Sequence, residues 1–271
     1  MKKKTNIFRV KLDENRQTVE QKYWSNDPID QLLREYSQGV DDILSEIWSL
    51  HLPSNSLSTL YAVGGYGREE LHPYSDIDLL VVSETLEEEK NQIENFLRDV
   101  FDLNLEVGHS VRDPEECKKE AINDITVATS ISERRLVAGN PSISKKIDDA
   151  LIDDEIWPGK DFFEAKLDEQ KDRHNQYNDS EYNLEPNVKT SPGTLRDIHT
   201  ILWVCQKSYG TTDLNDLTNS KILTKQERAW LINGRNFLWW VRFGLHLLAG
   251  RKEDRRTHHL CLDLDRGECV L

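Results

Sequence analysis

The feature that most constrains the fold of this chain is a pair of short apolar runs separated by a glycine-rich loop. Residues 60–63 (LYAV) end at Gly64-Gly65, and residues 77–82 (IDLLVV) form a second run that carries an aspartate. Apolar runs of this length, bounded by glycine, are typical of buried strands. A charged segment with apolar residues at helical spacing and then an alternating segment follow, over 86–101 and 103–111. The order strand, loop, strand, helix, strand predicts a small α/β or α+β unit.

Helices are expected on both sides of this unit. Residues 1–26 are polar with little pattern, and the first helix signal is Asp27-Pro28, an N-cap acceptor followed by a proline suited to the first helical position. After about residue 113 the pattern is helical, and a capping-box sequence begins at Thr224. We therefore expect an N-terminal helical segment (1–55), a central core (56–140), a helical domain (141–250) and an irregular tail (251–271).

Composition excludes several classes of protein. The net charge of −14, from 35 basic and 49 acidic residues, argues against binding nucleic acid, because phosphate backbones need a basic surface. No apolar stretch approaches the length of a membrane span, and no apolar run follows the basic N-terminus as it would in a signal peptide. The four cysteines lack the close pairs of a zinc site or a disulfide framework. We expect a reduced, cytoplasmic globular protein.

The chemistry is expected at Asp76 and Asp78. Side chains alternate along a strand, so these two carboxylates point to the same side, about 7 Å apart along the backbone, while Ile77 points to the other. Neighbouring carboxylates repel each other, and a divalent cation such as Mg²⁺ relieves that repulsion. The alternative is a turn with capping aspartates, which fits poorly because Asp78 lies within the apolar run.

Several other residues are candidates for the same site. Glycines at 64, 65 and 67 would let a phosphate approach the backbone, and Arg68 offers a fork of donors. Glu106 lies in the third predicted strand and could supply a third carboxylate; an exposed strand glutamate is the alternative. For His72 and His109 a structural role is the favoured interpretation, and Trp239 and Trp240 are expected in the core rather than in a stacking platform.

This arrangement resembles the DNA polymerase β-like nucleotidyltransferase superfamily, and within it the bacterial protein-PII uridylyltransferase/uridylyl-removing enzymes. The resemblance is carried by three stretches, 64–80, 105–112 and 182–199. It implies an α+β fold: a polymerase β-like nucleotidyltransferase core, with a small mixed sheet and helices, followed by a helical domain. From the first helix to about Arg251 the chain resembles this family.

The resemblance also implies a reaction and a set of site residues. UTP would bind with Mg²⁺, a tyrosine of the small PII signalling protein would attack the α-phosphate, and pyrophosphate would leave. Asp76, Asp78 and Glu106 would hold the metal and act in catalysis. Nucleotide binding would involve Gly64, Gly65, Gly67, Arg68, Ser75, Lys189 and Arg196, although a structural salt bridge is an equal alternative for Lys189 and Arg196.

The chain departs from the family pattern in places. Glu69 and Thr194 stand where the family often has glycine, and no room exists in 271 residues for the family's uridylyl-removing HD domain or glutamine-sensing ACT domains. Residues 255–271 lose helical spacing, so we expect a truncated tail that packs on nothing. Three hypotheses follow: an active uridylyltransferase, an inactive remnant that binds only nucleotide or PII, and a nucleotidyltransferase with another acceptor or nucleotide.

Overall fold

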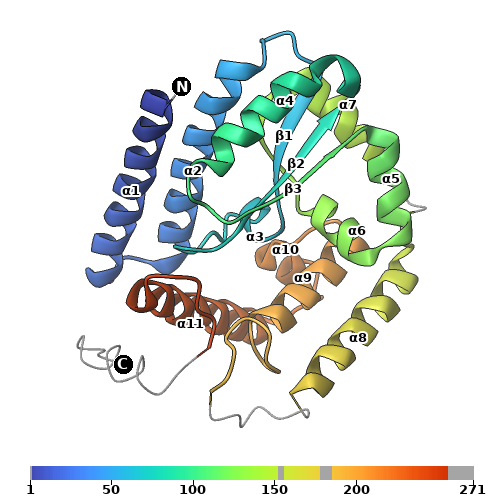
Figure 1. Cartoon of the computed structure of the whole chain (residues 1–271). Coiled ribbons are helices and arrows are strands. Elements are labelled where there is room, and N and C mark those ends of the chain that lie inside the picture. Colours follow the sequence, from blue (N-terminus) through green and yellow to red (C-terminus); the bar gives the residue numbers. More distant parts are fainter. Residues whose placement is uncertain (1, 152–155, 178–184, 256–271) are drawn as a thin grey trace. The chain divides into compact units, whose positions relative to one another are not determined.

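The computed structural model describes residues 2–151, 156–177 and 185–255, and the chain forms two compact units, Met1–Ile156 and Trp157–Leu271. The elements of the first unit are α1 (Lys2–Trp24), α2 (Ile29–His51), β1 (Ser58–Val63), α3 (Gly64–Gly67), β2 (Ile77–Ser83), α4 (Leu86–Phe101), β3 (Val107–Arg112), α5 (Pro114–Asn123), α6 (Ile125–Ser132), β4 (Arg135–Gly139) and α7 (Pro141–Leu151) (Figure 1). This unit contains the whole described sheet.

The sheet has four strands in the order β3-β2-β1-β4 and is mixed. β1 is antiparallel to both β2 and β4, whereas β2 and β3 are parallel. A parallel pair needs a crossover connection, and α4 provides it. On α2 and α4 the rings of Trp48 and Phe96 meet edge to face, with centroids 5.0 Å apart. The small mixed sheet with its helices confirms the predicted α+β class.

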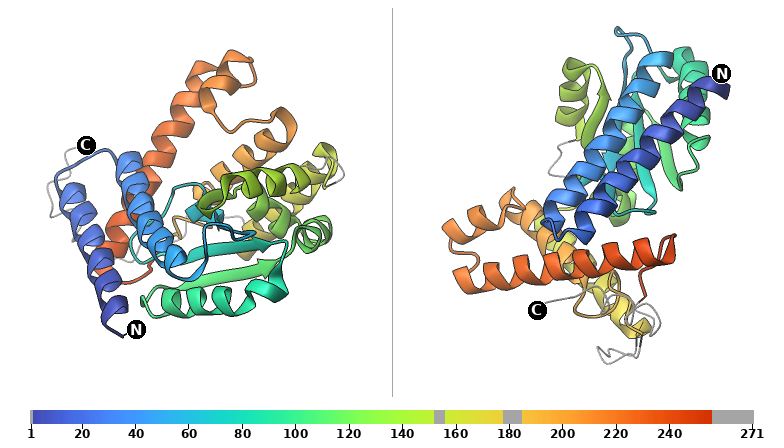
Figure 2. Two further views of the ribbon diagram at one scale, coloured as in Figure 1. Left: turned by 90° about the horizontal axis from the view of Figure 1, so that it is seen from above. Right: turned by 90° about the vertical axis from the view of Figure 1, so that its left-hand side faces the viewer.

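The N-terminal helices belong to the same unit as the sheet. α1, which the low-pattern sequence did not predict, packs on α2 through a narrow row of buried residues, namely Phe8, Leu12, Val19 and Tyr23 (Figure 2). α2 begins at Ile29 with Pro28 in the N-cap position, and it contacts α4 and β4. α7 contacts β1 and β4. The boundary between units therefore falls after Ile156, later than the expected core boundary at 140.

Secondary structure within 56–112 follows the prediction closely. β1, β2 and α4 lie where the apolar patterns indicate. β3 starts only at Val107, because residues 103–106 form the turn and connection that precede the strand. Asp113 caps α5 with a capping box that also uses Glu116. The expectation of helices alone after residue 113 was wrong, because β4 forms the outer strand beside β1.

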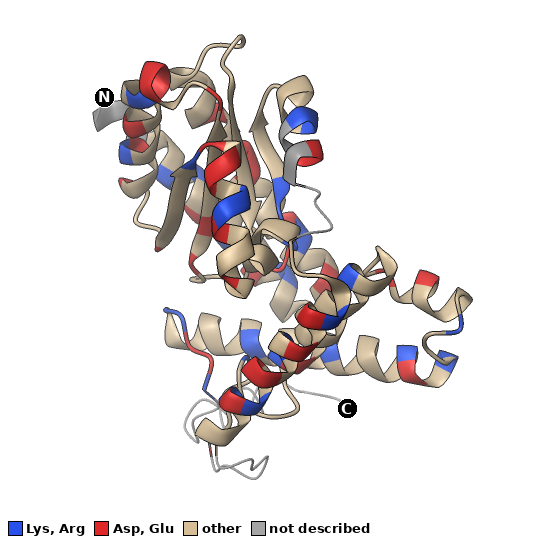
Figure 3. Cartoon of the chain, turned by 90° about the vertical axis from the view of Figure 1, so that its right-hand side faces the viewer, with Lys and Arg blue, Asp and Glu red and all other residues tan. Residues whose placement is uncertain are grey.

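The second unit is helical in its described part, with α8 (Gly159–Gln176), α9 (Leu195–Tyr209), α10 (Leu214–Asn219) and α11 (Lys225–Ala249). The capping box predicted at Thr224 starts α11. Leu202, Cys205, Leu214 and Leu217 form a buried cluster. Acidic and basic residues are interspersed along the helices of both units (Figure 3). Among the described residues, no helix is long and apolar enough to cross a membrane.

Candidate active site

Asp76 and Asp78 stand at the start of β2, where the strand leaves its loop. Asp78 is opposite Val63 of antiparallel β1 and opposite Gly108 of parallel β3. Ile77 is fully buried, whereas both aspartates are partly exposed, as alternation along a strand requires. The two carboxylates therefore share the more open face of the sheet.

Two glycines make room for the Asp78 carboxylate. A Cβ on Gly108 would lie 2.4 Å from Asp78 Oδ1, closer than real Cβ atoms come, and a Cβ on Gly64 would lie 3.3 Å from Oδ2. Gly64 also has a φ of +60°, in the left-handed region that glycine adopts most readily. Any side chain at 108 would displace the carboxylate, so this glycine sets the position of Asp78.

Glu106 lies directly before β3, at the level of Asp76. The Ile77 N–H donates to the Glu106 carbonyl oxygen at 2.9 Å, and the parallel register pairs Ile77 with Val107. Paired residues in parallel strands point to the same side, so extending the register places Asp76, Asp78 and Glu106 on one face. Glu106 is exposed to solvent. Its role as a third carboxylate stays a prediction.

A divalent metal fits this face by ligand chemistry. Among the described residues, no group of three or more His, Cys, Asp and Glu side chains is gathered as a metal centre would be. Mg²⁺ commonly uses only one or two carboxylates together with substrate phosphates. The space that Gly64 and Gly108 leave around Asp78 suits such a shared site, in which the nucleotide completes the coordination.

Arg68 is held between two carboxylates. Its Nε lies 3.0 Å from Glu70 Oε2, and its Nη1 lies 2.5 Å from Glu133 Oε1. Burial alone would lower the pKa of the guanidinium, but Glu70 and Glu133 outweigh it and raise that pKa above its ordinary value. These ion pairs join the loop after α3 to the end of α6, a contact that local sequence patterns cannot reveal. Phosphate binding by Arg68 stays a prediction.

The remaining candidates of the loop make packing contacts, and their part in nucleotide binding stays a prediction. A Cβ on Gly67 would meet the Glu133 carbonyl oxygen at 2.2 Å, so this glycine permits the close approach of α3 to α6. Ser75 is buried, and its N–H donates to the His72 carbonyl oxygen at 3.1 Å. His72 is buried, with Nδ1 2.9 Å from the Glu70 carbonyl oxygen, in keeping with a structural role.

Lys189 and Arg196 belong to the second unit. The Lys189 N–H donates to Asn187 Oδ1 at 2.9 Å, and the Arg196 N–H donates to the Lys189 carbonyl oxygen at 2.9 Å. The Arg196 guanidinium lies over the ring of Trp203, 5.2 Å from its centroid. The two residues thus adjoin each other at the start of α9, and their contact with nucleotide remains a prediction.

Two partly exposed aspartates of the second unit escaped sequence reasoning. Asp254 accepts from Arg242 Nε at 2.6 Å, with His246 Nε2 3.2 Å away. Asp197 is held by Gln170, Arg173, His174 and the Gly193 N–H. The separation of His246 and Asp254 in the sequence matches no recognised motif, so sequence patterns could not pair them. Arg255 forms a backbone bridge with Asn187, so the prediction that the tail packs on nothing was wrong there; 256–271 lie outside the described residues.

Comparison with known proteins agrees with this geometry. Residues 40–132 match the family described as a nucleotidyltransferase domain, and residues 161–265 match the family described as GlnD PII-uridylyltransferase. Residues 40–132 therefore form a nucleotidyltransferase domain. More particularly, the chain is similar to the N-terminal part of the bifunctional uridylyltransferase/uridylyl-removing enzymes.

Several relatives bear that name, and three illustrate the similarity. One from Pseudomonas fluorescens strain Pf-5 is 44% identical over 97% of this chain, and one from strain SBW25 is 46% identical over 92%. One from Azotobacter vinelandii is 44% identical over 93%. The chain spans 28–29% of the length of these relatives. Family similarity continues to residue 265, which corrects the expectation that it ends near Arg251.

Proposed function

We propose that this chain transfers UMP from UTP to a tyrosine of a PII signalling protein, using Mg²⁺ held by Asp76 and Asp78. The observation that carries the proposal is the glycine-lined position of Asp78 on the open face of the sheet, between Val63 and Gly108. The names of the relatives and of the matching family point to uridylyl transfer as the reaction. The activity is proposed for this portion of the longer relatives.

The chain's residues would divide the work as follows. The backbone of Gly64 and Gly65 lets the triphosphate approach β1, because no side chain intervenes. Asp76 and Asp78 would hold the metal against the phosphate oxygens. Bound there, a divalent cation offsets the negative charge of the triphosphate and of the departing pyrophosphate.

In the proposed reaction the tyrosine oxygen attacks the α-phosphorus. A new oxygen–phosphorus bond forms, and the bond from that phosphorus to the oxygen bridging to the β-phosphate breaks. Pyrophosphate leaves, and the tyrosine proton passes to the Glu106 carboxylate, which is exposed to solvent directly before β3. Lys189 and Arg196 would add contacts to the nucleotide.

The direct test is transfer of label from UTP labelled at its α-phosphate to PII, with Mg²⁺. Wild type should label PII, and Asp78→Asn should lose transfer by on the order of a thousandfold, because the variant removes the charge that binds the metal. Asp102→Asn, an exposed position after α4, is the matched control and should retain full activity.

Other outcomes select the competing hypotheses. Nucleotide binding without labelling of PII by wild type would contradict the proposal and indicate a binding remnant. Faster transfer from ATP than from UTP, or labelling of a different acceptor, would indicate another nucleotidyltransferase. Chelation of Mg²⁺ should abolish transfer reversibly.

A further inference from the structure

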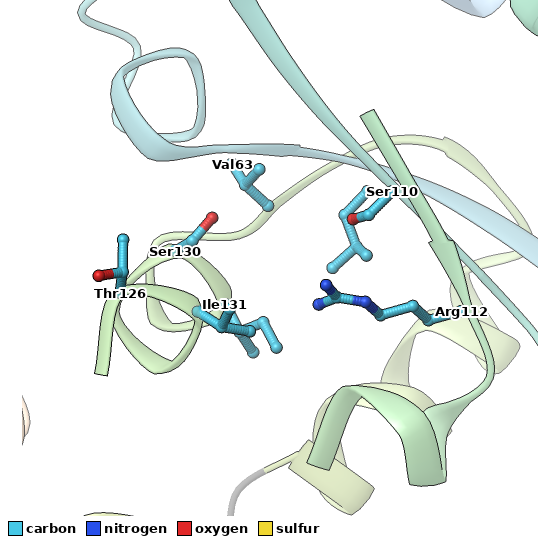
Figure 4. A pocket seen from close by; sticks show the side chains of 8 residues that line it. Val63, Ser110, Arg112, Thr126, Ser130 and Ile131 are labelled. Atoms are coloured by element: carbon cyan, nitrogen blue, oxygen red, sulfur yellow. The ribbon is translucent and has the colours of Figure 1, made fainter. Parts of the chain in front are cut away.

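A cavity of about 210 Å³ lies beside the aspartates, between the sheet and α6. It is lined by Val63 of β1, Leu80 of β2, Ser110 and Arg112 of β3, and Thr126, Val127, Ser130 and Ile131 of α6 (Figure 4). Leu80 pairs with Ser110, two residues beyond the pairing of Asp78 with Gly108. Because side chains alternate, the cavity opens on the same face of the sheet as Asp78.

The cavity and the proposed nucleotide site share β1. Val63, one of its walls, is the residue that pairs with Asp78, and Gly64 follows it directly. Side chains of directly paired residues have Cβ atoms about 5 Å apart. The Val63 wall of the cavity is therefore close to Asp78, whereas Arg112, which pairs with Val82, lies further along the strands, about 13 Å for a rise of about 3.3 Å per residue.

Arg112 gives the cavity its charge. Its guanidinium extends from β3 toward α6, facing Ile131 (Figure 4). None of the lining residues is acidic. Three other arginines of this unit are each held by a carboxylate: Arg68 by Glu70 and Glu133, Arg134 by Asp148, and Arg135 by Asp41.

This contrast indicates an anionic ligand. Within the described ranges, no carboxylate forms an ion pair with Arg112. Three hydroxyl groups, on Ser110, Thr126 and Ser130, add neutral donors around it. The apolar walls lower the local dielectric, which strengthens the attraction between a guanidinium and a bound oxyanion.

The size of the cavity limits what can enter. Pockets that enclose a whole drug-sized ligand measure about 300–1,000 Å³, so 210 Å³ suits only part of a nucleotide. A bound nucleobase usually stacks on an aromatic ring, and none of the residues that line the cavity is aromatic. A diphosphate matches both the guanidinium fork and the hydroxyl donors.

We propose that Arg112, with the surrounding hydroxyl groups, binds the β- and γ-phosphates of the nucleoside triphosphate and holds the pyrophosphate as it leaves. The inference rests on the proposed function, which needs a departing pyrophosphate next to Asp78. Arg68 already forms ion pairs with Glu70 and Glu133, which makes it less available to phosphate. The phosphate contact is therefore assigned to Arg112.

The test is the affinity of the full chain for pyrophosphate with Mg²⁺, measured by titration calorimetry. Arg112→Gln should weaken pyrophosphate binding about tenfold or more, as expected for the loss of a charge-assisted hydrogen bond. Arg112→Lys should recover part of the affinity. UMP, which lacks the β- and γ-phosphates, should bind all variants equally. The matched control is Arg98→Gln on α4, an exposed arginine away from the cavity.

Any of the following results would overturn the inference: no pyrophosphate binding by wild type, unchanged affinity in Arg112→Gln, equal weakening of UMP binding, or an altered preference between UTP and CTP. The last two would mean that the cavity holds the α-phosphate or the base. Inorganic phosphate that binds through Arg112 without competition from UTP would also overturn it, since it would identify a separate anion site. Binding needs no PII, so a failed transfer assay with retained Arg112-dependent binding would refute only the proposed function. Equal melting temperatures verify that the variants fold.

Discussion

Asp78 and Asp254 are both partly shielded aspartates, one in each unit, and their surroundings differ. The oxygens of Asp78 lie where glycine side chains would otherwise stand, at Gly64 and Gly108. Asp254 has a side chain 13% exposed and lies against Arg242 and His246, which are 9% and 0% exposed. The Asp78 carboxylate occupies space that the two glycines leave open, whereas the Asp254 carboxylate pairs with an arginine and a histidine.

The difference separates a site from a structural element. Burial by itself would raise the pKa of Asp254, but the hydrogen bond with His246 and the charge of Arg242 outweigh it, so this pKa lies well below its ordinary value. A carboxylate so compensated stabilises its unit and has little capacity left for a metal. The glycines around Asp78 instead keep a volume in which a cation and phosphate can meet it.

The largest expected effect comes from removing the charge of Asp254. Asp254→Asn removes the negative charge that pairs with Arg242 and the fully buried His246, which should lower the free energy of unfolding by about 3 kcal/mol. Urea denaturation followed by tryptophan fluorescence measures it. Asp78→Asn is the counterpart and should change unfolding by less than about 1 kcal/mol while removing activity. Similar losses of stability in both variants would erase the distinction between the two sites.

A methyl group at Gly108 tests whether the open space positions Asp78. Gly108→Ala would bring Cβ to 2.4 Å from Asp78 Oδ1, so the carboxylate must move. Transfer should fall by about 10- to 100-fold, the order expected for a displacement of about 1 Å in a catalytic group. Gly234→Ala on α11 is the control, because its Cβ would meet nothing within 4 Å. Undiminished transfer by Gly108→Ala would show that the carboxylate does not need this space.

The pH dependence of stability sharpens the interpretation of Asp254. Its folded-state pKa is lowered, so its contribution is fully present above the unfolded pKa of about 3.9 and is lost as pH falls below it. The stability difference between wild type and Asp254→Asn should shrink by up to about 1.4 kcal/mol per pH unit below that point. Urea titrations at a series of pH values from 3 to 6 measure it. A constant difference over this range would contradict the lowered pKa.

The smallest expected effect concerns the start of α11. Thr224→Ala removes the side-chain acceptor for the Glu227 N–H and should cost about 1 kcal/mol. Thermal or urea unfolding measures the loss, and Thr224→Ser should restore most of it. A cost near that of Asp254→Asn would mean that this cap matters as much to the second unit as its buried ion cluster does.

Local patterns predicted the centre of the first unit well. β1, β2 and α4 follow from continuous apolar runs and helical spacing, and the shared face of Asp76 and Asp78 follows from alternation alone. α1 was missed because its buried row contains about one residue per turn among many polar ones. β4 was missed because it is a short outer strand without strong burial, so only its pairing with β1 defines it.

Long-range contacts set the limit of prediction in the site. The ion pair of Arg68 with Glu133 spans 65 residues, and no local pattern links the two. The position of Arg112 opposite α6 depends in the same way on how the helix packs over the sheet. Sequence alone suggested that Arg68 faces phosphate, because its carboxylate partner Glu133 becomes a neighbour only after folding.

The parallel pairing of β2 with β3 has a consequence for how the site assembles. Gly64 is brought to Asp78 by the antiparallel pairing of Val63 with Asp78, which are only 15 residues apart in the sequence. Glu106 and Arg112 reach the sheet only after the α4 crossover. Contacts close in sequence require less chain ordering than those across a long connection. We expect the Gly64–Asp78 half to form early during folding and the β3 half to follow the docking of α4. Damage to the buried face of α4, such as at Phe96, should therefore misplace Glu106 and Arg112 before it disturbs Asp78.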